Sequence, residues 1–384
     1  MKESIIIRNF GPIVEIEIEN IRPLTIFIGE SGSGKSTVIK VLALFRWIYK
    51  MMSIRSYLKH SGISKSPFRF NFPAYLKNNG FEGYMNKNTE IEYIYGTCKI
   101  GYSNGKLNGT DFLIDKSELS LEKICFISDK RNLIPDILAN NTEKRTAGFF
   151  LKETLGDYLI ATKIVNKINI DYLKVKVVVK KTNNGEKYYI EGTDNEKPFS
   201  IKLEDASSGT QTVTPLSIIT EYFSKHYDIV KSFNQAIFSY VSNNDKLSDF
   251  KAVSNIGDLK HKRVNIHIEE PELSLYPESQ RSLINFMINR CFANIRTDYS
   301  MTLMMATHSP YIINHINLLV LAHQKKELIE EASIDFNDVD VFEITEGYLN
   351  NLKQKGQFVF DTRPLSNPIS DIYQKYNELK SEQA

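Results

Sequence analysis

The stretch IFIGESGSGKSTVIK, residues 26–40, joins an apolar run, a turn of glycine and serine, and the start of a helical pattern. Its central part, Gly29 to Ser36, fits G-x-x-x-x-G-K-[S/T] at every fixed position. Glycines let successive backbone N–H groups converge on one point, and the N-terminus of the following helix adds its own unpaired N–H groups. The stretch therefore predicts an anion cradle between a buried strand and a helix.

The end of this segment narrows the anion to a nucleotide. A lysine at the position of Lys35 reaches the β- and γ-phosphates, and a hydroxyl at the position of Ser36 ligates Mg²⁺. We therefore expect ATP and Mg²⁺ as ligands. An ordinary Gly/Ser loop is the alternative, but it would rarely match all fixed positions between a strand and a helix. The predicted nucleotide-binding residues are Gly29, Glu30, Ser31, Gly32, Ser33, Gly34, Lys35, Ser36 and Thr37.

Composition limits the class of protein. The chain has 384 residues, of which 42% are hydrophobic and 24% charged, as in globular proteins with a sizeable core. The net charge of +2 predicts no whole-molecule attraction to nucleic acid or membrane. The cysteines lack zinc-site spacing, and the sequence shows neither a signal-peptide pattern nor an apolar run long enough for a bilayer. We expect a cytoplasmic protein without membrane contact.

The residue pattern along the chain predicts an α/β protein. Strands are expected at residues 5–9, 14–20 and 24–28, and a helix from 35 to about 52. A second sheet is suggested around residues 91–115, and KVKVVVKK and EKYYIEG around Asn184-Gly185 predict a hairpin. We expect one domain over residues 1–384, with a basic β lobe at about 50–122, a helical insertion at about 136–170, a polar insertion at about 243–262 and a tail at 366–384, of which 369–379 form a short helix.

Two carboxylates end the apolar strand in VNIHIEEPELSLYP, residues 264–277. A nucleotide-hydrolysing site needs one acid for the hydration shell of Mg²⁺ and another to orient or deprotonate the attacking water. By position, Glu269 is the predicted magnesium-side acid, with Ser36 as the other metal ligand, and Glu270 is the water-side acid. Aspartate is usual at the first position, so we expect Glu269 to act through a bridging water. A strand that ends in a solvated acidic turn is the alternative.

Another apolar strand, in MTLMMATHSP at residues 301–310, ends at His308. One helix separates it from Glu270, as expected for adjacent parallel strands, whose carboxyl ends share one edge of the sheet. A neutral imidazole there can hydrogen-bond the γ-phosphate or the attacking water. A purely structural histidine is the alternative.

The segment EDASSGTQT, residues 204–212, predicts a second anion-binding helix N-terminus at Ser207, Ser208 and Gly209. The glycine-rich turn of the same chain already provides a phosphate-binding site, so a second anion-binding site is informative about function. A simple capped helix is the alternative.

In this order, GESGSGKST, ASSGTQ, IHIEEPE and ATHS resemble the motifs of ABC-type ATPases of the RecF/SMC/OLD group. NFGPIVEIEIENIRPLTIFIGESGSGKST is similar to the start of their small prokaryotic members, among them ATPase subunits of anti-phage systems such as Septu and certain retrons. The resemblance covers residues 3–48, 200–225 and 262–316. It implies a P-loop NTPase fold of ABC type, in which a mixed or parallel central sheet is flanked by helices and carries an antiparallel β lobe and a helical insertion.

The resemblance also implies a mechanism. Two protomers would sandwich two ATP molecules, so we expect a homodimer or a higher oligomer. Ser207, Ser208 and Gly209 would bind the partner's nucleotide, Glu270 and Lys35 would be catalytic, and His308 would be the switch histidine. The signature departs from the transporter pattern at Ala206 and Ser208. No clear glutamine follows Phe126-Ile127, so Arg131 either takes that lid-contacting role or is a surface arginine.

Further activities are expected outside this chain. Asp338 and Asp340 mimic the paired aspartates of a nuclease, but alternation along one strand explains them, and too few residues follow for a domain of about 100 residues. No heptad run is long enough for a coiled-coil arm. The resemblance therefore implies a separate effector, a nuclease or toxin, in anti-phage defence.

Residues 36–81 contain eight basic side chains and no Asp or Glu, interleaved with aromatic residues. This mixture can hold a nucleic-acid backbone and stack on bases, and an aromatic-rich lobe packed on the sheet is the alternative. The competing function is therefore a RecF-like clamp on DNA, and a third is a nucleotide sensor that hardly hydrolyses ATP. The basic residues are Lys40, Arg46, Lys50, Arg55, Lys59, Lys65, Arg69 and Lys77.

Overall fold

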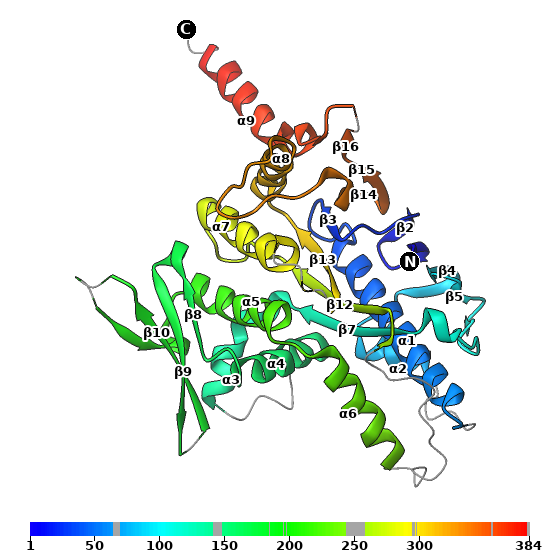
Figure 1. Ribbon diagram of the computed structural model, residues 1–384. Helices are drawn as coiled ribbons and strands as arrows, with labels where there is room; N and C mark the ends of the chain where they lie inside the picture. Colours follow the sequence, from blue (N-terminus) through cyan, green and yellow to red (C-terminus); the bar gives the residue numbers. More distant parts are fainter. Residues whose placement is uncertain are drawn as a thin grey trace.

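A mixed sheet runs through the molecule (Figure 1). The computed structural model describes residues 1–63, 70–140, 148–183, 185–194, 196, 198–242, 258–293, 296, 298–354 and 356–381. In these residues the sheet has 11 strands in the order β6-β5-β4-β1-β2-β15-β14-β3-β13-β12-β7. The strands are β1 (Glu3–Phe10), β2 (Ile13–Ile18), β3 (Leu24–Ile28), β4 (Met85–Tyr95), β5 (Cys98–Ser103), β6 (Lys106–Asn108), β7 (Ser120–Ile127), β12 (His261–Glu269), β13 (Ser300–Thr307), β14 (Val339–Thr345) and β15 (Tyr348–Asn351).

The half of the sheet that contains the predicted motifs is parallel. β14, β3, β13, β12 and β7 are parallel neighbours. Every residue of β3 is buried, as expected for a parallel strand covered on both faces. The carboxyl ends of these strands lie at one edge, which is where open α/β sheets bind ligands.

The other half of the sheet is antiparallel except for the pair of β2 and β15, which is parallel. β4 pairs with β1 from Tyr95 opposite Glu3 to Met85 opposite Phe10, and β5 and β6 continue outward from β4. The second sheet suggested around residues 91–115 is therefore wrong, because these strands satisfy the backbone groups of β1 and extend the main sheet instead.

Helices cover the faces of the sheet. α1 (Lys35–His60) contacts β7, β12 and β13 and runs past the predicted end near residue 52. The others are α2 (Phe72–Asn78), α3 (Ile134–Asn140), α4 (Phe149–Thr162), α5 (Ser208–Lys225), α6 (Ile229–Ser242), α7 (Pro277–Ile288), α8 (Pro310–Lys325) and α9 (Arg363–Ser381). Among the described residues, none of these helices is both long and apolar enough to cross a bilayer.

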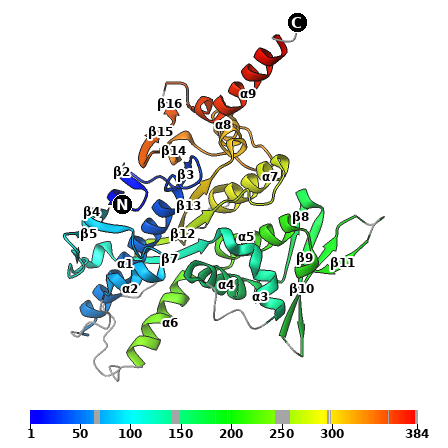
Figure 2. The ribbon, with the colours of Figure 1, turned by 180° about the vertical axis from the view of Figure 1, so that it is seen from behind.

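A smaller antiparallel sheet follows α4 in the chain, with strand order β11-β10-β9-β8. It comprises β8 (Lys167–Ile170), β9 (Val175–Thr182), β10 (Gly185–Gly192) and β11 (Ser200–Lys202). β9 and β10 form the predicted hairpin, although Asn184 of its turn lies outside the described residues. Figures 1 and 2 show α3, α4 and α5 on one side of this sheet.

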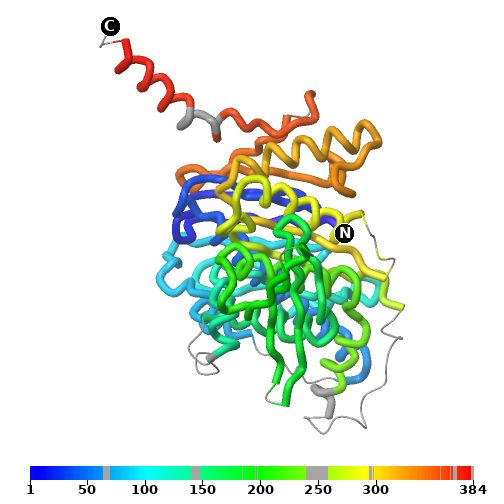
Figure 3. Tube along the Cα trace, turned by 90° about the vertical axis from the view of Figure 1, so that its left-hand side faces the viewer, coloured from blue at the N-terminus to red at the C-terminus, as the bar shows by residue number. Residues whose placement is uncertain are grey.

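Three predicted boundaries differ from the structure. Within its described residues, the helical insertion comprises α3 and α4 and ends before residue 170, since β8 begins at Lys167. Most of the polar insertion lies outside the described residues, and β12 begins at His261. The C-terminal helix α9 is 19 residues long rather than short, and Figure 3 shows it projecting from the rest of the molecule.

Taken together, the topology confirms the predicted α/β class: a mixed central sheet with flanking helices, an antiparallel β part and an inserted helical segment.

Candidate nucleotide-binding site

The glycine-rich turn connects β3 to α1, as the motif requires. Gly29 has φ +147, and a Cβ there would lie 2.4 Å from the Ile344 carbonyl oxygen of β14. Gly34 caps α1 with φ +113. Side chains are strongly disfavoured at such angles, so these two glycines determine the path of the turn and leave the first N–H groups of α1 unobstructed.

Lys35 bends back over this turn. Its side chain is buried, and Nζ donates to the carbonyl oxygens of Gly29 at 2.9 Å and Glu30 at 2.6 Å. Burial lowers the pKa of Lys35 to about 8, an effect that the carboxylates of Glu270 and Glu272 oppose. Phosphate oxygens would give this amine stronger, charge-assisted partners than the two carbonyls.

Glu269 lies at the carboxyl end of β12 with 2% of its surface exposed. Its Oε1 accepts a hydrogen bond from Lys40 Nζ at 2.8 Å, whereas its Oε2 is buried without a partner among the described residues. Burial raises the pKa of Glu269, and Lys40 and the Ser36 hydroxyl act in the opposite direction.

This arrangement fits a magnesium ion. The Ser36 hydroxyl and Glu269 Oε2, which lacks a partner among the described residues, are hard oxygen groups of the kind that Mg²⁺ prefers, directly or through a water. The described residues contain no group of three or more His, Cys, Asp or Glu side chains that could hold a metal. Mg²⁺ would therefore depend on the phosphates of a nucleotide for its remaining ligands, as is usual for this ion.

Glu270 and His308 meet at the same edge. His308 Nε2 lies 3.8 Å from Glu270 Oε1, and both side chains are about one-third exposed. The backbone N–H of His308 donates to Glu272 Oε1 at 2.5 Å. Glu270 has φ +46, an uncommon conformation for a residue with a side chain. The structure thus places the predicted water-side acid next to the predicted switch histidine.

The segment Ser207-Ser208-Gly209 begins α5. Ser207 is the N-cap, and its Oγ accepts from the Thr210 N–H at 3.4 Å. A Cβ on Gly209 would lie 2.9 Å from the Ser274 carbonyl oxygen, so the helix start packs closely on the turn after β12. Within the part of the chain that the structure describes, no hydrogen bond or ion pair joins this segment to the phosphate loop.

Two sequence interpretations need correction. The interpretation of Arg131 as a surface arginine is wrong, because its side chain is fully buried. A continuous basic face over Lys40 to Lys77 is also wrong: Lys40 pairs with Glu269, and Arg46 and Arg55 are buried.

The aromatic-rich packing alternative describes this region better. Arg46 donates to Glu3 at 2.7 Å, and Trp47 packs on Tyr75 with ring centroids 4.8 Å apart. Lys59 and Lys77 are exposed, and Lys65 and Arg69 lie outside the described residues. The basic residues of α1 do not form one exposed surface because α1 packs against the sheet and α2, which bury most of its residues.

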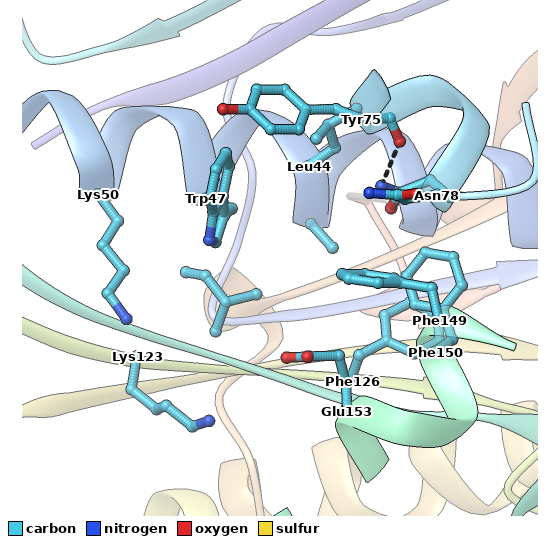
Figure 4. Close-up of a pocket in the computed structure, with 13 residues that line it drawn as sticks. Leu44, Trp47, Lys50, Tyr75, Asn78, Lys123, Phe126, Phe149, Phe150 and Glu153 are labelled. Carbon is cyan, nitrogen blue, oxygen red and sulfur yellow. Dashed lines mark hydrogen bonds between the residues drawn. The ribbon is translucent and has the colours of Figure 1, made fainter. Parts of the chain in front are cut away.

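A cavity of about 310 Å³ lies between α1, α2, β7 and α4, apart from the phosphate loop (Figure 4). Aromatic rings of Trp47, Phe126, Phe149 and Phe150 line it, and burial lowers the pKa of Lys50 at its edge to about 8. None of its lining residues belongs to the predicted nucleotide site. The predicted nucleotide residues instead follow the open edge formed by β3, β12 and β13.

No protein-family model matches the chain, and no curated protein matches it in sequence. Among solved structures, it is similar to an SMC head bound to the C-terminal winged-helix domain of ScpA, with 10% identity, coverage of 92% of this chain and 98% of that one, and a TM-score of 0.38. For the recombination mediator RecF of the RecFOR pathway these values are 10%, 91%, 98% and 0.32. For the ATP-binding cassette MJ0796, in a dimeric post-hydrolysis state with ADP and Pi, they are 12%, 90%, 96% and 0.30. Similarity of this size concerns the fold alone.

Proposed function

We propose that this chain is an ATP-binding and ATP-hydrolysing switch of the ABC type, which dimerises around ATP. One observation carries the proposal: a glycine-rich turn of the phosphate-loop pattern, a buried carboxylate and an acid–histidine pair occur at the ends of β3, β12 and β13. One oxygen of that carboxylate has no partner among the described residues. An anion cradle alone would not need the carboxylates. Together they match the requirements of phosphoryl transfer to water.

Each residue has a role that follows from its position. The loop N–H groups and Lys35 would bind the phosphates. Ser36, and Glu269 through a bridging water, would hold Mg²⁺, which when bound would neutralise negative charge on the phosphates. Glu270 orients the attacking water and accepts its proton. His308, close to Glu270, hydrogen-bonds the γ-phosphate or that water.

The dimer completes this site. Ser207 and Ser208 are exposed at the start of α5, where N–H groups and the helix dipole favour an anion. We propose that each copy presents this segment to the γ-phosphate held by its partner. ATP then joins the two copies, and hydrolysis of ATP lets the two copies separate.

Glu270→Gln and Lys35→Ala test this function, with phosphate release and molecular mass in solution as the measurements. Glu270→Gln should bind ATP, lose at least about 100-fold in turnover and accumulate as an ATP-bound dimer, because the general base is gone. Lys35→Ala should neither bind ATP nor dimerise. Glu278→Gln, at an exposed acid on α7, is the control and should behave like the unaltered protein.

Full-rate hydrolysis by a monomer would contradict the proposal. ATP-dependent dimers of the unaltered protein that hardly hydrolyse ATP would instead indicate the nucleotide sensor.

We further propose that the switch controls a separate effector, a nuclease or toxin, in anti-phage defence. The support is the sequence resemblance together with α9, whose Ile372, Tyr373, Tyr376 and Leu379 are all more than half exposed. Spacings of three and four residues place Ile372, Tyr376 and Leu379 on one face of the helix, and an exposed apolar stripe of this kind is typical of a partner contact.

Purification from the native host tests the effector. A protein that co-purifies in constant ratio would support an effector. If the triple variant Ile372→Ser, Tyr376→Ser, Leu379→Ser loses this protein but still hydrolyses ATP, the effector binds through α9. Recovery of nucleic acid without any protein partner would favour the alternative function.

That alternative, a nucleic-acid-binding ATPase of RecF type, has an observation of its own. The register of the small sheet places five lysines on the surface opposite to the buried Val177 and Ile190. We call this surface the lysine face: Lys167, Lys176, Lys180, Lys187 and Lys202.

Acidic side chains offset only part of this charge. Glu191 pairs with Lys176 at 2.9 Å and Lys180 at 3.3 Å, and Glu204 pairs with Lys202 at 3.3 Å. Lys180 lies directly opposite Lys187, and like charges in this arrangement destabilise a sheet. Glu191 offsets this only at Lys180, since the described residues give Lys187 no ion pair. The lysine face therefore fits a nucleic-acid backbone better than the Lys40 to Lys77 segment does.

A further inference from the structure

Arg131 links three segments that belong to the proposed site. It lies in the short helical turn Asp129–Leu133 directly after β7 and is fully buried. Nη1 donates to the carbonyl oxygens of Ser128 at 3.1 Å and Glu269 at 2.7 Å. Nη2 donates to the Glu270 carbonyl oxygen at 2.6 Å, and Nε donates to that of Thr212, in the first turns of α5, at 3.2 Å.

These acceptors are unusual for a buried guanidinium. Among the described residues Arg131 has no ion pair with a carboxylate, and all four acceptors are backbone carbonyl groups. Burial lowers the pKa of Arg131 to about 10, although nearby carboxylates, first among them Glu272 and Asp129, oppose this. Burying a charge without a direct ion pair is costly, so a neutral residue would serve better if the position only had to be filled. A rigid fork of donors, however, can fix several carbonyl groups at once.

The fixed carbonyl groups flank the catalytic acid. Glu270 has φ +46, a conformation that persists only where its surroundings hold it. Its N–H donates to the Ala306 carbonyl oxygen at 2.8 Å, and Arg131 holds the carbonyl groups on either side of its Cα. The direction in which the Glu270 side chain leaves the backbone therefore depends on Arg131.

We propose that Arg131 is a positioning residue that couples the start of α5 to Glu270. When Ser207 and Gly209 engage a nucleotide on the partner copy, any displacement of α5 reaches Arg131 through the Thr212 carbonyl group and reaches Glu270 through its other hydrogen bonds. The acid is thereby aligned with water only in the dimer. This inference rests on the proposed function and adds the residue that carries the coupling.

Arg131→Lys tests the proposal, because a lysine keeps the charge but cannot bond all four carbonyl groups in a fixed plane. We expect kcat for ATP hydrolysis to fall about 100-fold, the cost of a small misplacement of a catalytic group, while KM for ATP changes less than about threefold. Arg46→Lys is the matched control: it alters another buried arginine, paired with Glu3, and should lower thermal stability without this split.

A double-mutant cycle distinguishes positioning from general damage. In the Glu270→Gln background, Arg131→Lys should have no further effect on kcat, because Arg131 acts through the lost carboxylate. Equal losses in both backgrounds, or an unchanged kcat in Arg131→Lys, would overturn the proposal. If Arg131→Lys does not fold, Arg131→Gln, which keeps two donors, takes its place in the cycle; failure of both to fold would make Arg131 a structural residue and also overturn it.

The outcome is separable from that of the proposed function. Unaltered protein that does not hydrolyse ATP contradicts the function itself. If the unaltered protein hydrolyses ATP and Glu270→Gln behaves as expected, but Arg131→Lys leaves kcat unchanged, only the coupling through Arg131 is contradicted.

Discussion

Lys35 shows how one residue can report ligand binding through its charge. Its amine is held by two carbonyl groups in a buried place, and burial lowers its pKa to about 8. A triphosphate beside it would favour the charged form and raise the pKa again. The proton balance of ATP binding should therefore change with pH.

We predict that Lys35 takes up a proton when ATP binds at pH above about 8. At pH near 6.5 Lys35 is already protonated before ATP binds, so it contributes no proton uptake. As the pH rises through about 8, Lys35 of the nucleotide-free protein loses its proton. ATP binding then has to restore that proton, so the affinity for ATP falls as the pH rises. Calorimetry in buffers of different ionisation enthalpy measures the uptake. Lys35→Arg is the control, since a guanidinium stays charged over this range; uptake that persists in this variant would assign it to another group.

Lys40 is a second case at the residue scale. The sequence placed it among basic residues suited to nucleic acid, whereas the structure pairs it with Glu269. Only the approach of α1 to β12 brings the two together. Lys40 is therefore a neighbour of the proposed magnesium ligand, not part of a surface for a polyanion.

At the scale of elements, the start of α5 depends on its contact with the turn after β12. Gly209 packs against the Ser274 carbonyl oxygen, and Ser274 itself has φ +59. A side chain at residue 209 would push the helix start away from this turn. The phosphate loop, in a different part of the chain, would remain intact.

We predict that Gly209→Ala abolishes the ATP-dependent dimer but leaves ATP binding by single copies within about threefold, because the added Cβ meets backbone rather than a movable side chain. Light scattering and nucleotide binding are the measurements. Gly156→Ala is the matched control, since a Cβ there meets nothing within 4 Å in the described part of the chain and α4 should gain up to about 1 kcal/mol in stability. A normal Gly209→Ala dimer would remove α5 from the proposed interface.

Predictions of elements from the sequence succeeded where the pattern was local. The β9–β10 hairpin follows from alternating residues around Asn184-Gly185, and β3, β12 and β13 follow from apolar runs that end in polar motifs. The extension of α1 to His60 was missed, because its last turns are kept helical by packing. Tyr57 and Leu58 there are buried against other elements, which no local pattern shows.

At the scale of the whole molecule, charge is distributed by the register of the small sheet. A net charge of +2 predicted no attraction of the whole molecule to nucleic acid, yet alternation along β8 to β11 collects five lysines on one side. α3, α4 and α5 lie on the other side (Figure 2). The lysine face is therefore the part of the molecule where the alternative function can be tested.

If the lysine face binds DNA or RNA, Lys180→Glu with Lys187→Glu should weaken binding at least tenfold, and binding by the unaltered protein should fall steeply with salt. The measurement is fluorescence anisotropy with a labelled duplex and a single strand. Lys106→Glu with Lys116→Glu, at exposed lysines outside the small sheet, is the control. Binding that ignores salt and the first pair of changes would exclude this surface, and binding only to anionic vesicles would indicate a membrane instead.

The sequence by itself determined the glycine-rich turn at residues 29–34, the strand ends at Glu269 and Thr307 and the helix start at Ser207, because short motifs with fixed spacing encode local backbone geometry. The tertiary structure decided the partner of Lys40, the burial of Arg131 and the common surface of the lysines. These depend on which distant strands become neighbours and in which register, and that is set by the packing of the whole core rather than by any single segment.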